Sequence, residues 1–385
     1  MDTLFKIDSS RLHALNIPFR LEFSHAMATR AGSDSMVLAV ESSDNRGYGE
    51  AVVREYVSGS IGDETSLLED AAGIVREILA PLAGRDTTWS DCAEYLRSLS
   101  PSYSELPMVC AVESALLDLA CHECGKDLYQ LLGCRPLKEE IIYGGTLPML
   151  PRKAAEWILD QYLEIGISNI RIKIGTDRAY NENILRLARE KAGDDFDFRV
   201  DANASWTLEH ARDNLLMLRD YGINLIEEPF GRNNNAIFDL LEDSAVRGFK
   251  FVADESVLAV GDVEEIASQG HFHVLNLRLA KNGGLLRLIE MAELAKDRGL
   301  FYQIGCHVGE TGILSALGRV AASLLPDAIY NDGSYDRHLL SANITEEDFT
   351  FGPGGKAPVI SGHGTAYSID EEKLEELTVG KIKCL

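Results

Sequence analysis

From residue 141 onward, short apolar runs of β-strand character alternate with segments of helical spacing, and this alternation restricts the fold more than any other feature. Three of the helical segments end in a glycine followed by an apolar residue, at Gly166, Gly222 and Gly299. Glycine there supplies the left-handed cap that ends a helix before the next strand. The eight runs are Ile141–Met149, Asn169–Gly175, Phe196–Asn203, Ile223–Pro229, Phe249–Glu255, His273–Lys281, Leu300–Val308 and Ile329–Ser334.

Eight strands that alternate with helices predict a parallel (β/α) barrel, an α/β fold. A doubly wound open sheet is the alternative, but no Gly-x-Gly-x-x-Gly turn follows any early strand. The first part of the chain has a different pattern. Runs of β character at 17–23, 36–41 and 48–53, with a polar stretch at 24–35, precede helical spacing from 64 to 133. Strands followed by helices predict a separate α+β unit.

Three consecutive barrel strands end in a carboxylate, at Asp201, Glu227 and Asp254, each separated from the next by one β/α unit. The ends of parallel barrel strands meet at one rim, where active sites form. A lone acid at a strand end is more often a helix cap, but three in register predict a metal site. Oxygen ligands alone suit a hard divalent cation, Mg²⁺ or Mn²⁺.

Two cations precede these acids by one strand. Arg171 and Lys173 share one face of their strand, because side chains alternate with a period of two. Acids and an anionic substrate facing them would offset the cost of burying both charges. The crowded positive field favours the neutral, proton-accepting form of the Lys173 amine. Arg278 shares a face with Asn276 on the sixth strand, and we expect it to point inwards.

The composition limits the possible partners. A formal net charge of −24 at pH 7 argues against nucleic acid or an anionic membrane surface, because both bind positive patches. No segment approaches the roughly 18 consecutive apolar residues of a membrane span, and the N-terminus lacks the pattern of a signal peptide. The 7 scattered cysteines fit reduced thiols, so we expect a cytoplasmic protein. A zinc site at Cys121, His122 and Cys124 is disfavoured, because these residues lie in a helical pattern.

The ordered set of motifs resembles the enolase superfamily, and specifically its muconate-lactonizing subgroup. The resemblance rests on the cation pair, the three acids, Asp254-Glu255-Ser256 and Lys281-Asn282-Gly283-Gly284. The early turn Gly47-Tyr48-Gly49-Glu50 and the helical segment 111–133 extend it over nearly the whole chain. It implies an α+β capping domain at 1–135, a modified (β/α) barrel of TIM type at 136–335, and a C-terminal segment, 336–385, that returns to the capping domain.

The resemblance also implies an activity. The three acids would hold Mg²⁺ while a base removes the proton α to a carboxylate, giving a metal-stabilised enediolate. We therefore expect an isomerase with Lys173 as its base, either a cycloisomerase or an epimerase of a small carboxylate or amino-acid derivative. Enolase relatives are commonly oligomers, so we expect a homo-oligomer.

The chain departs from the family pattern in its bases. Arg171 and Arg278 stand where lysines are usual, and an arginine is a poor base at neutral pH. We expect Arg171 to tune Lys173, and Arg278 to stabilise developing negative charge. His307, on the seventh strand, lies where the related mandelate-racemase subgroup keeps its second base. It is either a second base or a loop histidine at the rim.

Five further residues are candidates for substrate binding: Arg30, Arg54, Asn203, Glu310 and Asp332. Arg30 and Arg54 lie in cap segments that close the site in the family, and each either meets a polar group of the substrate or is a solvated surface residue. Asp332 is followed by Gly333-Ser334, so only half of the Asp-x-Asp pair that grips the substrate ammonium group in dipeptide epimerases is present.

Two other functions remain open at this point. A lyase of the o-succinylbenzoate-synthase or acid-sugar-dehydratase type would use the same Lys173 to remove water. A non-catalytic binding protein on the same scaffold is the third hypothesis, suggested by the two replaced lysines. The retained Lys173 and the complete set of acids favour an enzyme.

Overall fold

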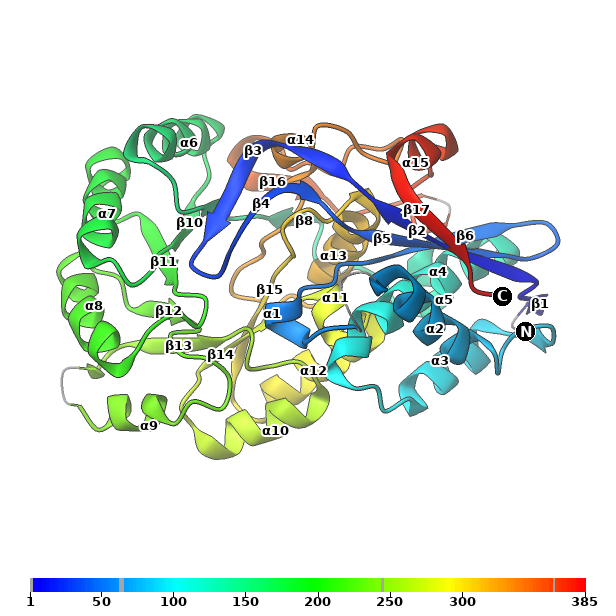
Figure 1. Cartoon of the computed structure of the whole chain (residues 1–385), viewed down its shortest axis with the longest axis horizontal. Helices are drawn as coiled ribbons and strands as arrows, with labels where there is room; N and C mark the ends of the chain where they lie inside the picture. The colour runs from blue at the N-terminus through cyan, green and yellow to red at the C-terminus, as the bar shows by residue number, and fades with distance from the viewer. Residues whose placement is uncertain (1–2, 62–65, 244–245, 363) are drawn as a thin grey trace.

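In the computed structural model, which describes residues 3–61, 66–243, 246–362 and 364–385, a curled parallel sheet with helices on its outside lies against an antiparallel cap (Figure 1). Seven strands form the curled sheet in chain order and all neighbours are parallel. This is the modified (β/α) barrel expected from the alternation of strands and helices. The strands are β9 (Gly145–Leu147), β10 (Asn169–Lys173), β11 (Asp197–Asp201), β12 (Leu225–Glu227), β13 (Lys250–Ala253), β14 (Val274–Leu277) and β15 (Phe301–Ile304).

The helices between these strands cover the outside of the sheet, and the apolar faces of both layers merge into one buried core. The expected glycine caps are confirmed, because Gly166, Gly222 and Gly299 have φ of +86°, +66° and +74°. The helices are α6 (Arg152–Ile165), α7 (Arg178–Ala192), α8 (Leu208–Asp220), α9 (Ala236–Leu241), α10 (Val260–Gln269), α11 (Leu279–Asn282), α12 (Leu285–Asp297) and α13 (Gly312–Leu324).

The predicted eighth strand, Ile329–Ser334, is not a regular strand. It makes a single parallel bridge from Asn331 to Ile304 of β15, and Gly333 and Ser334 then take φ of +147° and +55°, which end the extended conformation. The segment nonetheless joins the two edges of the sheet. The backbone N–H of Gly144, just before β9, donates to the Asn331 carbonyl at 2.9 Å. Backbone conformation, rather than a missing partner, therefore shortens this element.

The predicted first run, Ile141–Met149, is divided in two by a close approach of the backbone. A Cβ on Gly144 would lie 2.2 Å from Oδ1 of Asn169, so the chain passes too close to β10 for any side chain there. Before the break, β8 (Glu140–Ile142) pairs antiparallel with β16 (Lys356–Pro358), outside the barrel. After it, β9 begins the parallel sheet.

The cap contains a four-stranded antiparallel sheet in the order β17-β2-β5-β6, formed by Thr378–Lys383, Ser9–Leu15, Met36–Glu41 and Arg46–Ala51. The chain's last strand thus pairs with β2 of the cap. Helix α4 (Leu106–Cys124) packs directly on β6, where a Cβ on Gly49 would lie 2.0 Å from the Ala111 carbonyl oxygen. The expected helical setting of Cys121 and Cys124 is confirmed by α4. The remaining cap helices are α2 (Leu67–Leu79), α3 (Trp89–Ser98) and α5 (Leu128–Leu132).

A hairpin of β3 (Ile17–His25) and β4 (Ala28–Ser33) leaves the cap and reaches over the barrel (Figure 1). The polar stretch at 24–35 was expected to join two strands, but half of it forms the strand β4 and its first two residues end β3. The short helix α1 (Glu55–Ser58) lies next to the β3–β4 hairpin at the barrel mouth. Small elements complete the chain: β1 (Phe5–Lys6), β7 (Asp86–Thr87), α14 (Asp336–Leu339) and α15 (Glu371–Leu377).

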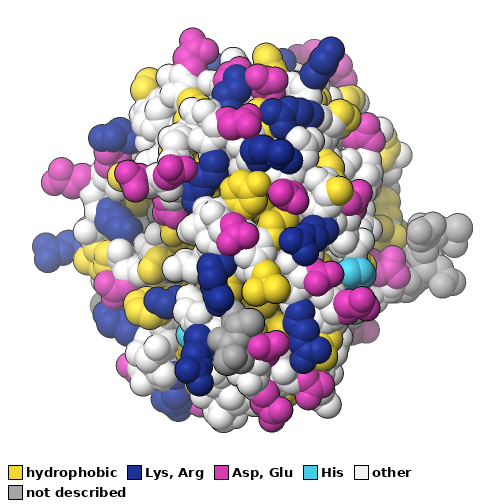
Figure 2. Space-filling view, turned by 90° about the vertical axis from the view of Figure 1, so that its left-hand side faces the viewer, with side chains coloured by type: hydrophobic (Ala, Val, Ile, Leu, Met, Phe, Trp, Pro, Cys, Tyr) yellow, Lys and Arg dark blue, Asp and Glu magenta, His cyan; other side chains and the backbone are white. Residues whose placement is uncertain are grey.

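The surface mixes both signs of charge on the side where the barrel helices α7 and α8 lie. Figure 2 shows acidic and basic side chains interspersed there, with small apolar areas between them. The described helices include none with the length and apolar character needed to cross a membrane.

Candidate active site

The three predicted metal ligands meet at one rim of the barrel. Asp201 and Glu227 end β11 and β12 and lie opposite each other in the strand register, and Asp254 follows β13. All three are buried, and one oxygen of each lies within 4.8 Å of the others. Three carboxylates so close repel one another unless cations lie between them. This donor set fits a hard divalent cation, and these three residues could hold one.

Basic side chains from neighbouring strands contact all three acids. Arg171 Nη1 donates to both carboxylate oxygens of Glu227, at 2.8 and 3.0 Å, and Lys173 Nζ donates to Asp201 Oδ2 at 2.5 Å. Arg278 donates to Asp254 from the other side. Arg278 contacts Asp254 and lines the cavity, so its side chain points into the barrel mouth as expected.

The acids respond differently to this environment. Burial, with Glu227 as a neighbouring negative charge, raises the pKa of Asp201 to about 6. Burial alone would also raise the pKa of Glu227, but the charges of Arg171, Arg278 and Lys173 hold that pKa well below its ordinary value. Glu227 is therefore more firmly ionised than Asp201.

Three residues that support the acids were not predicted. Lys281 Nζ donates to Oδ1 and to the backbone carbonyl of Asp254, at 2.9 and 2.7 Å. The amides of Asn276 and Gln303 donate to Glu227 at 2.8 and 3.0 Å. A polar residue at an inward position of an apolar strand is the signal that could have identified Gln303 on β15.

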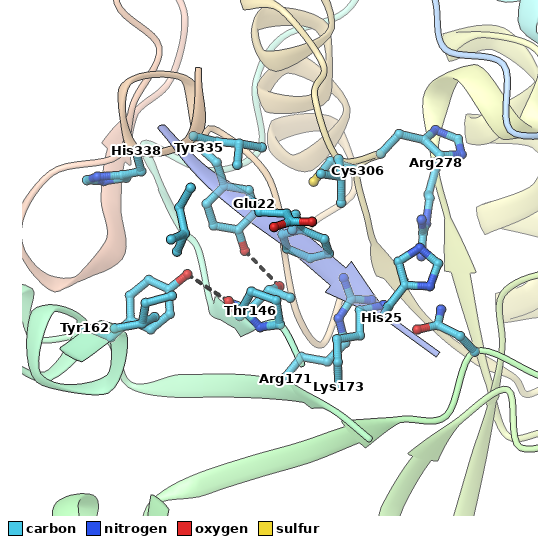
Figure 3. A pocket seen from close by; sticks show the side chains of 18 of the residues that line it. Glu22, His25, Thr146, Tyr162, Arg171, Lys173, Arg278, Cys306, Tyr335 and His338 are labelled. Carbon is cyan, nitrogen blue, oxygen red and sulfur yellow. Dashed lines mark hydrogen bonds between the residues drawn. The ribbon is translucent and has the colours of Figure 1, made fainter. Parts of the chain in front are cut away.

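A cavity that is open to solvent at its mouth lies between this rim and the cap. Arg171, Lys173 and Arg278 face it from the barrel, as Figure 3 shows. Opposite these charges much of the wall is apolar or aromatic, and Thr146 hydrogen-bonds to Tyr162 and Tyr335 within that wall. The apolar and aromatic lining residues are Leu21, Phe23, Pro148, Ile158, Tyr162, Val308, Tyr335 and Leu339.

His307 also lines the cavity, and neither of its ring nitrogens has a hydrogen-bond partner among the described residues. Burial and the positive charges of Arg278 and Arg54 hold its pKa well below the ordinary value, so the imidazole is neutral. Its backbone N–H donates to Glu310 Oε1 at 2.6 Å. Burial raises the pKa of Glu310 to about 8. Glu310 lies outside the main cavity and holds the His307 loop instead.

Asn203 lines the cavity next to the acids. Its side-chain N–H donates to Glu255 Oε1 at 3.3 Å, while Asn203 Oδ1 is buried without a partner among the described side chains. Glu255 was not predicted as a site residue, although it belongs to the Asp254-Glu255-Ser256 sequence. Burial and the neighbouring Asp254 raise the pKa of Glu255 well above its ordinary value.

The other predicted binding residues make contacts within the protein. Asp332 is paired with Arg199 at 2.6 Å and with Arg171 at 3.4 Å, and it lies behind the cavity lining. Arg30 and Arg54 both contact Asp34, at 2.6 and 2.7 Å. None of Asp332, Arg30 and Arg54 is among the residues that line the main cavity.

The part of the chain that carries these residues matches a known protein family. The enolase C-terminal domain-like family matches residues 153–373. A hydrophobic dipeptide epimerase of Enterococcus faecalis is 26% identical over 337 residues, which cover 83% of this chain and 87% of that protein.

Two solved structures share the fold over nearly their whole length. An N-succinyl Arg/Lys racemase from Bacillus cereus superposes with a TM-score of 0.85 at 21% identity, covering 98% of this chain and 99% of the other. A dipeptide epimerase from Cytophaga hutchinsonii, complexed with Mg and D-Ala-L-Val, gives a TM-score of 0.83 at 23% identity, covering 99% and 100%. The chain belongs to the enolase C-terminal domain-like family, and with it to the enolase superfamily of enzymes.

Proposed function

We propose that this protein is an Mg²⁺-dependent isomerase that removes the proton α to the carboxylate of a small amino-acid derivative, with Lys173 as the base. The observation that carries the proposal is the position of Lys173, whose amine faces the cavity and contacts Asp201 at the rim of the acidic group. Asp201, Glu227 and Asp254 would hold Mg²⁺, with Mn²⁺ as the alternative. A divalent cation held there would stabilise the negative charge that develops on the substrate carboxylate.

The basic residues around the acids have separate roles in the proposed reaction. Lys173 accepts the α-proton from one side of the substrate, and Arg171 anchors Glu227 beside it. Strand β10 and strands β14 and β15 lie on opposite sides of the barrel, because β11, β12 and β13 separate them on one side and the 329–332 segment and β9 on the other. Arg278 and His307 therefore approach the substrate from the side opposite Lys173.

This second side decides which isomerase reaction follows. Arg278 is committed to Asp254 and keeps its proton, whereas neither ring nitrogen of the neutral His307 has a hydrogen-bond partner in the described ranges of the chain. In an inverting reaction, the base on one face removes the α-proton and the protonated partner on the other face delivers one. Neutral His307 would be the base for the enantiomer whose α-proton faces it, with protonated Lys173 as the donor, and the outcome is epimerisation or racemisation. With Lys173 alone, the outcome would be a one-base reaction such as cycloisomerisation.

The shape of the site indicates the class of substrate. Relatives are named for action on dipeptides and N-succinylated amino acids. Here much of the wall beyond the reacting centre is apolar, with Glu22 and His338 as polar members, and the apolar part suits an apolar side chain or acyl group. Asp332 forms ion pairs with Arg199 and Arg171 and is not among the residues that line the cavity, so it does not offer its carboxylate to a substrate ammonium group there. We propose an N-acylated apolar amino acid as substrate.

The test is proton exchange in D₂O. The purified protein with Mg²⁺ is incubated with N-acetyl- and N-succinyl-L-leucine, the matching phenylalanine derivatives, and the dipeptide L-Leu-L-Tyr. Proton NMR follows loss of the α-proton, and chiral chromatography follows configuration. We expect exchange with inversion for an N-acyl derivative, abolished by EDTA. Loss of water from the substrate, seen by mass spectrometry, would show the lyase instead, and no exchange with any compound would refute the proposal.

A further inference from the structure

Two arginines lie side by side in the barrel, one layer of side chains below the acidic rim. Arg171 of β10 and Arg199 of β11 are register partners on neighbouring parallel strands, and both are buried. The next inward pair of the same two strands is Lys173 and Asp201. Because neighbouring strands are only about 4.8 Å apart, two buried guanidinium groups at one height repel each other unless an anion lies between them.

Asp332 supplies this anion. Its carboxylate is buried, and its two oxygens divide between the arginines. Oδ1 accepts from Arg199 Nη2 at 2.6 Å, and Oδ2 lies 3.4 Å from Arg171 Nη2. Arg199 is itself held from two further sides, because its Nη1 donates to Asn169 Oδ1 at 2.7 Å and its Cζ lies 4.2 Å from the centroid of the Tyr330 ring. Asp332 is therefore a fixed anchor for Arg171.

Arg171 connects this anchor to the acidic rim. Its Nη2 faces Asp332, while its Nη1 donates to both carboxylate oxygens of Glu227, at 2.8 and 3.0 Å. Burial alone would lower the pKa of Arg171, but the charges of Glu227 and Asp332 raise that pKa well above its ordinary value, so the group stays charged. The same Nη1 is only 3.9 Å from Asp201 Oδ2. Without its anchor, Arg171 could turn toward Asp201 and compete with a cation for that oxygen.

We propose that Asp332 and Arg199 are positioning residues for the divalent-cation site, which hold the Arg171 guanidinium on Glu227 and away from Asp201. The inference rests on one part of the proposed function, the cation held by the three acids, and not on the reaction that follows. It gives Asp332 a role inside the protein that needs no second aspartate at position 334, where this chain has Ser334. Groups that orient metal ligands from behind typically contribute about 10- to 100-fold to metal affinity.

The first test is calorimetric titration of Mg²⁺ into protein that has been freed of metal by EDTA and dialysis. Asp332→Asn keeps the shape of the side chain and removes its charge, and we expect the Kd for Mg²⁺ to rise about tenfold or more. Asp336→Asn is the matched control, because this buried carboxylate is hydrogen-bonded by Ser315 and Asn343 instead of an arginine. We expect the control to bind Mg²⁺ like the wild type. An unchanged Kd in Asp332→Asn, or an equal rise in both variants, would overturn the proposal.

The second test asks whether Asp332 acts through Arg171. In the Arg171→Met background there is no guanidinium to anchor, so Asp332→Asn should change the Kd for Mg²⁺ by less than about twofold. A direct attraction between the Asp332 charge and the cation would persist in that background. A further weakening of about tenfold in the double variant would therefore overturn the proposal.

The third test separates positioning from stability. Asp332→Asn leaves the buried charge of Arg199 unpaired, which lowers stability, whereas the double variant Asp332→Asn with Arg199→Met removes both charges. By thermal unfolding of the metal-free proteins, we expect the double variant to recover most of the wild-type Tm. Its Kd for Mg²⁺ should stay raised, because Arg171 still lacks its anchor. Recovery of the Kd together with the Tm would overturn the proposal, and this variant decides it even if Asp332→Asn alone does not fold.

Failure of this inference is distinguishable from failure of the proposed function. A wild type that binds Mg²⁺ but exchanges no α-proton refutes the proposed reaction, and the same titrations then still decide the roles of Asp332 and Arg199. A wild type that binds neither Mg²⁺ nor Mn²⁺ overturns the inference itself.

Discussion

Both sides of the cavity carry basic side chains, but these side chains differ in whether they can accept and donate a proton. On the β10 side, Lys173 is an amine in contact with Asp201, able to accept and return a proton. On the β14–β15 side, the corresponding cation is Arg278, which keeps its proton, and the neutral His307 beside it is the proposed base. Under the proposed function, inversion of configuration would depend on a different type of base at each face.

The largest effect is expected from the acids that both sides share. Asp201→Asn removes a proposed metal ligand and the partner of Lys173, so we expect exchange to fall at least about a thousandfold. Asp197→Asn is the matched control on the same strand, because Asp197 lies at its other end and contacts Tyr330. Exchange rates and Mg²⁺ titration measure both. A fall in Asp197→Asn equal to that in Asp201→Asn would show a structural effect instead.

His307→Asn tests the β15 side alone. We expect inversion to fall at least about a hundredfold, because one general base is lost. Exchange without inversion should persist for the enantiomer whose α-proton faces Lys173. Chiral chromatography and α-proton NMR on the same samples separate the two readouts. Unchanged inversion would mean that His307 is only a residue of the rim.

The pH dependence of inversion tests whether the pKa of His307 is lower than that of an ordinary histidine. Burial and Arg278 keep the pKa of His307 well below 6.5, so its base form persists as the pH falls. With saturating Mg²⁺, whose charge would keep Asp201 ionised, we expect inversion to stay level from about pH 8 to about pH 5.5, without a decline near 6.5. Arg278→Gln removes one depressing charge, so the decline should move upward toward 6.5. A wild-type decline centred at 6.5 would contradict the role given to Arg278.

The smallest effect is expected at Arg30, one of the cap residues predicted to bind substrate. Arg30 is partly exposed and forms an ion pair with Asp34, and pairs of this kind contribute little. Arg30→Gln should therefore change KM by less than about twofold. A KM increase of tenfold with N-succinyl-L-leucine, but not with N-acetyl-L-leucine, would show that Arg30 reads a second carboxylate.

The barrel and its acidic rim could be predicted from the sequence, because both depend on local patterns of residues. Strand-end acids one β/α unit apart must meet at a rim, and glycines that cap helices mark where strands begin. The contacts of Arg54 and Asp332 do not follow from such rules. Asp34 and Arg199 reach them only after the cap hairpin and barrel are assembled, and each pairing removes a residue from the cavity wall. The shortened eighth strand has a similar origin, in the left-handed backbone at Ser334.

The most direct test of the account is enantiomer-resolved exchange by Lys173→Gln in D₂O. Each enantiomer of N-acetyl-leucine is incubated with the Mg²⁺-loaded variant and the wild type, and α-proton NMR gives the two rates. The account predicts that the variant loses exchange of the enantiomer whose α-proton faces β10, and keeps exchange of the other through His307. The variant of His307 should show the opposite pattern. Exchange of both enantiomers by Lys173→Gln at wild-type rates would contradict the assignment of Lys173 as the base.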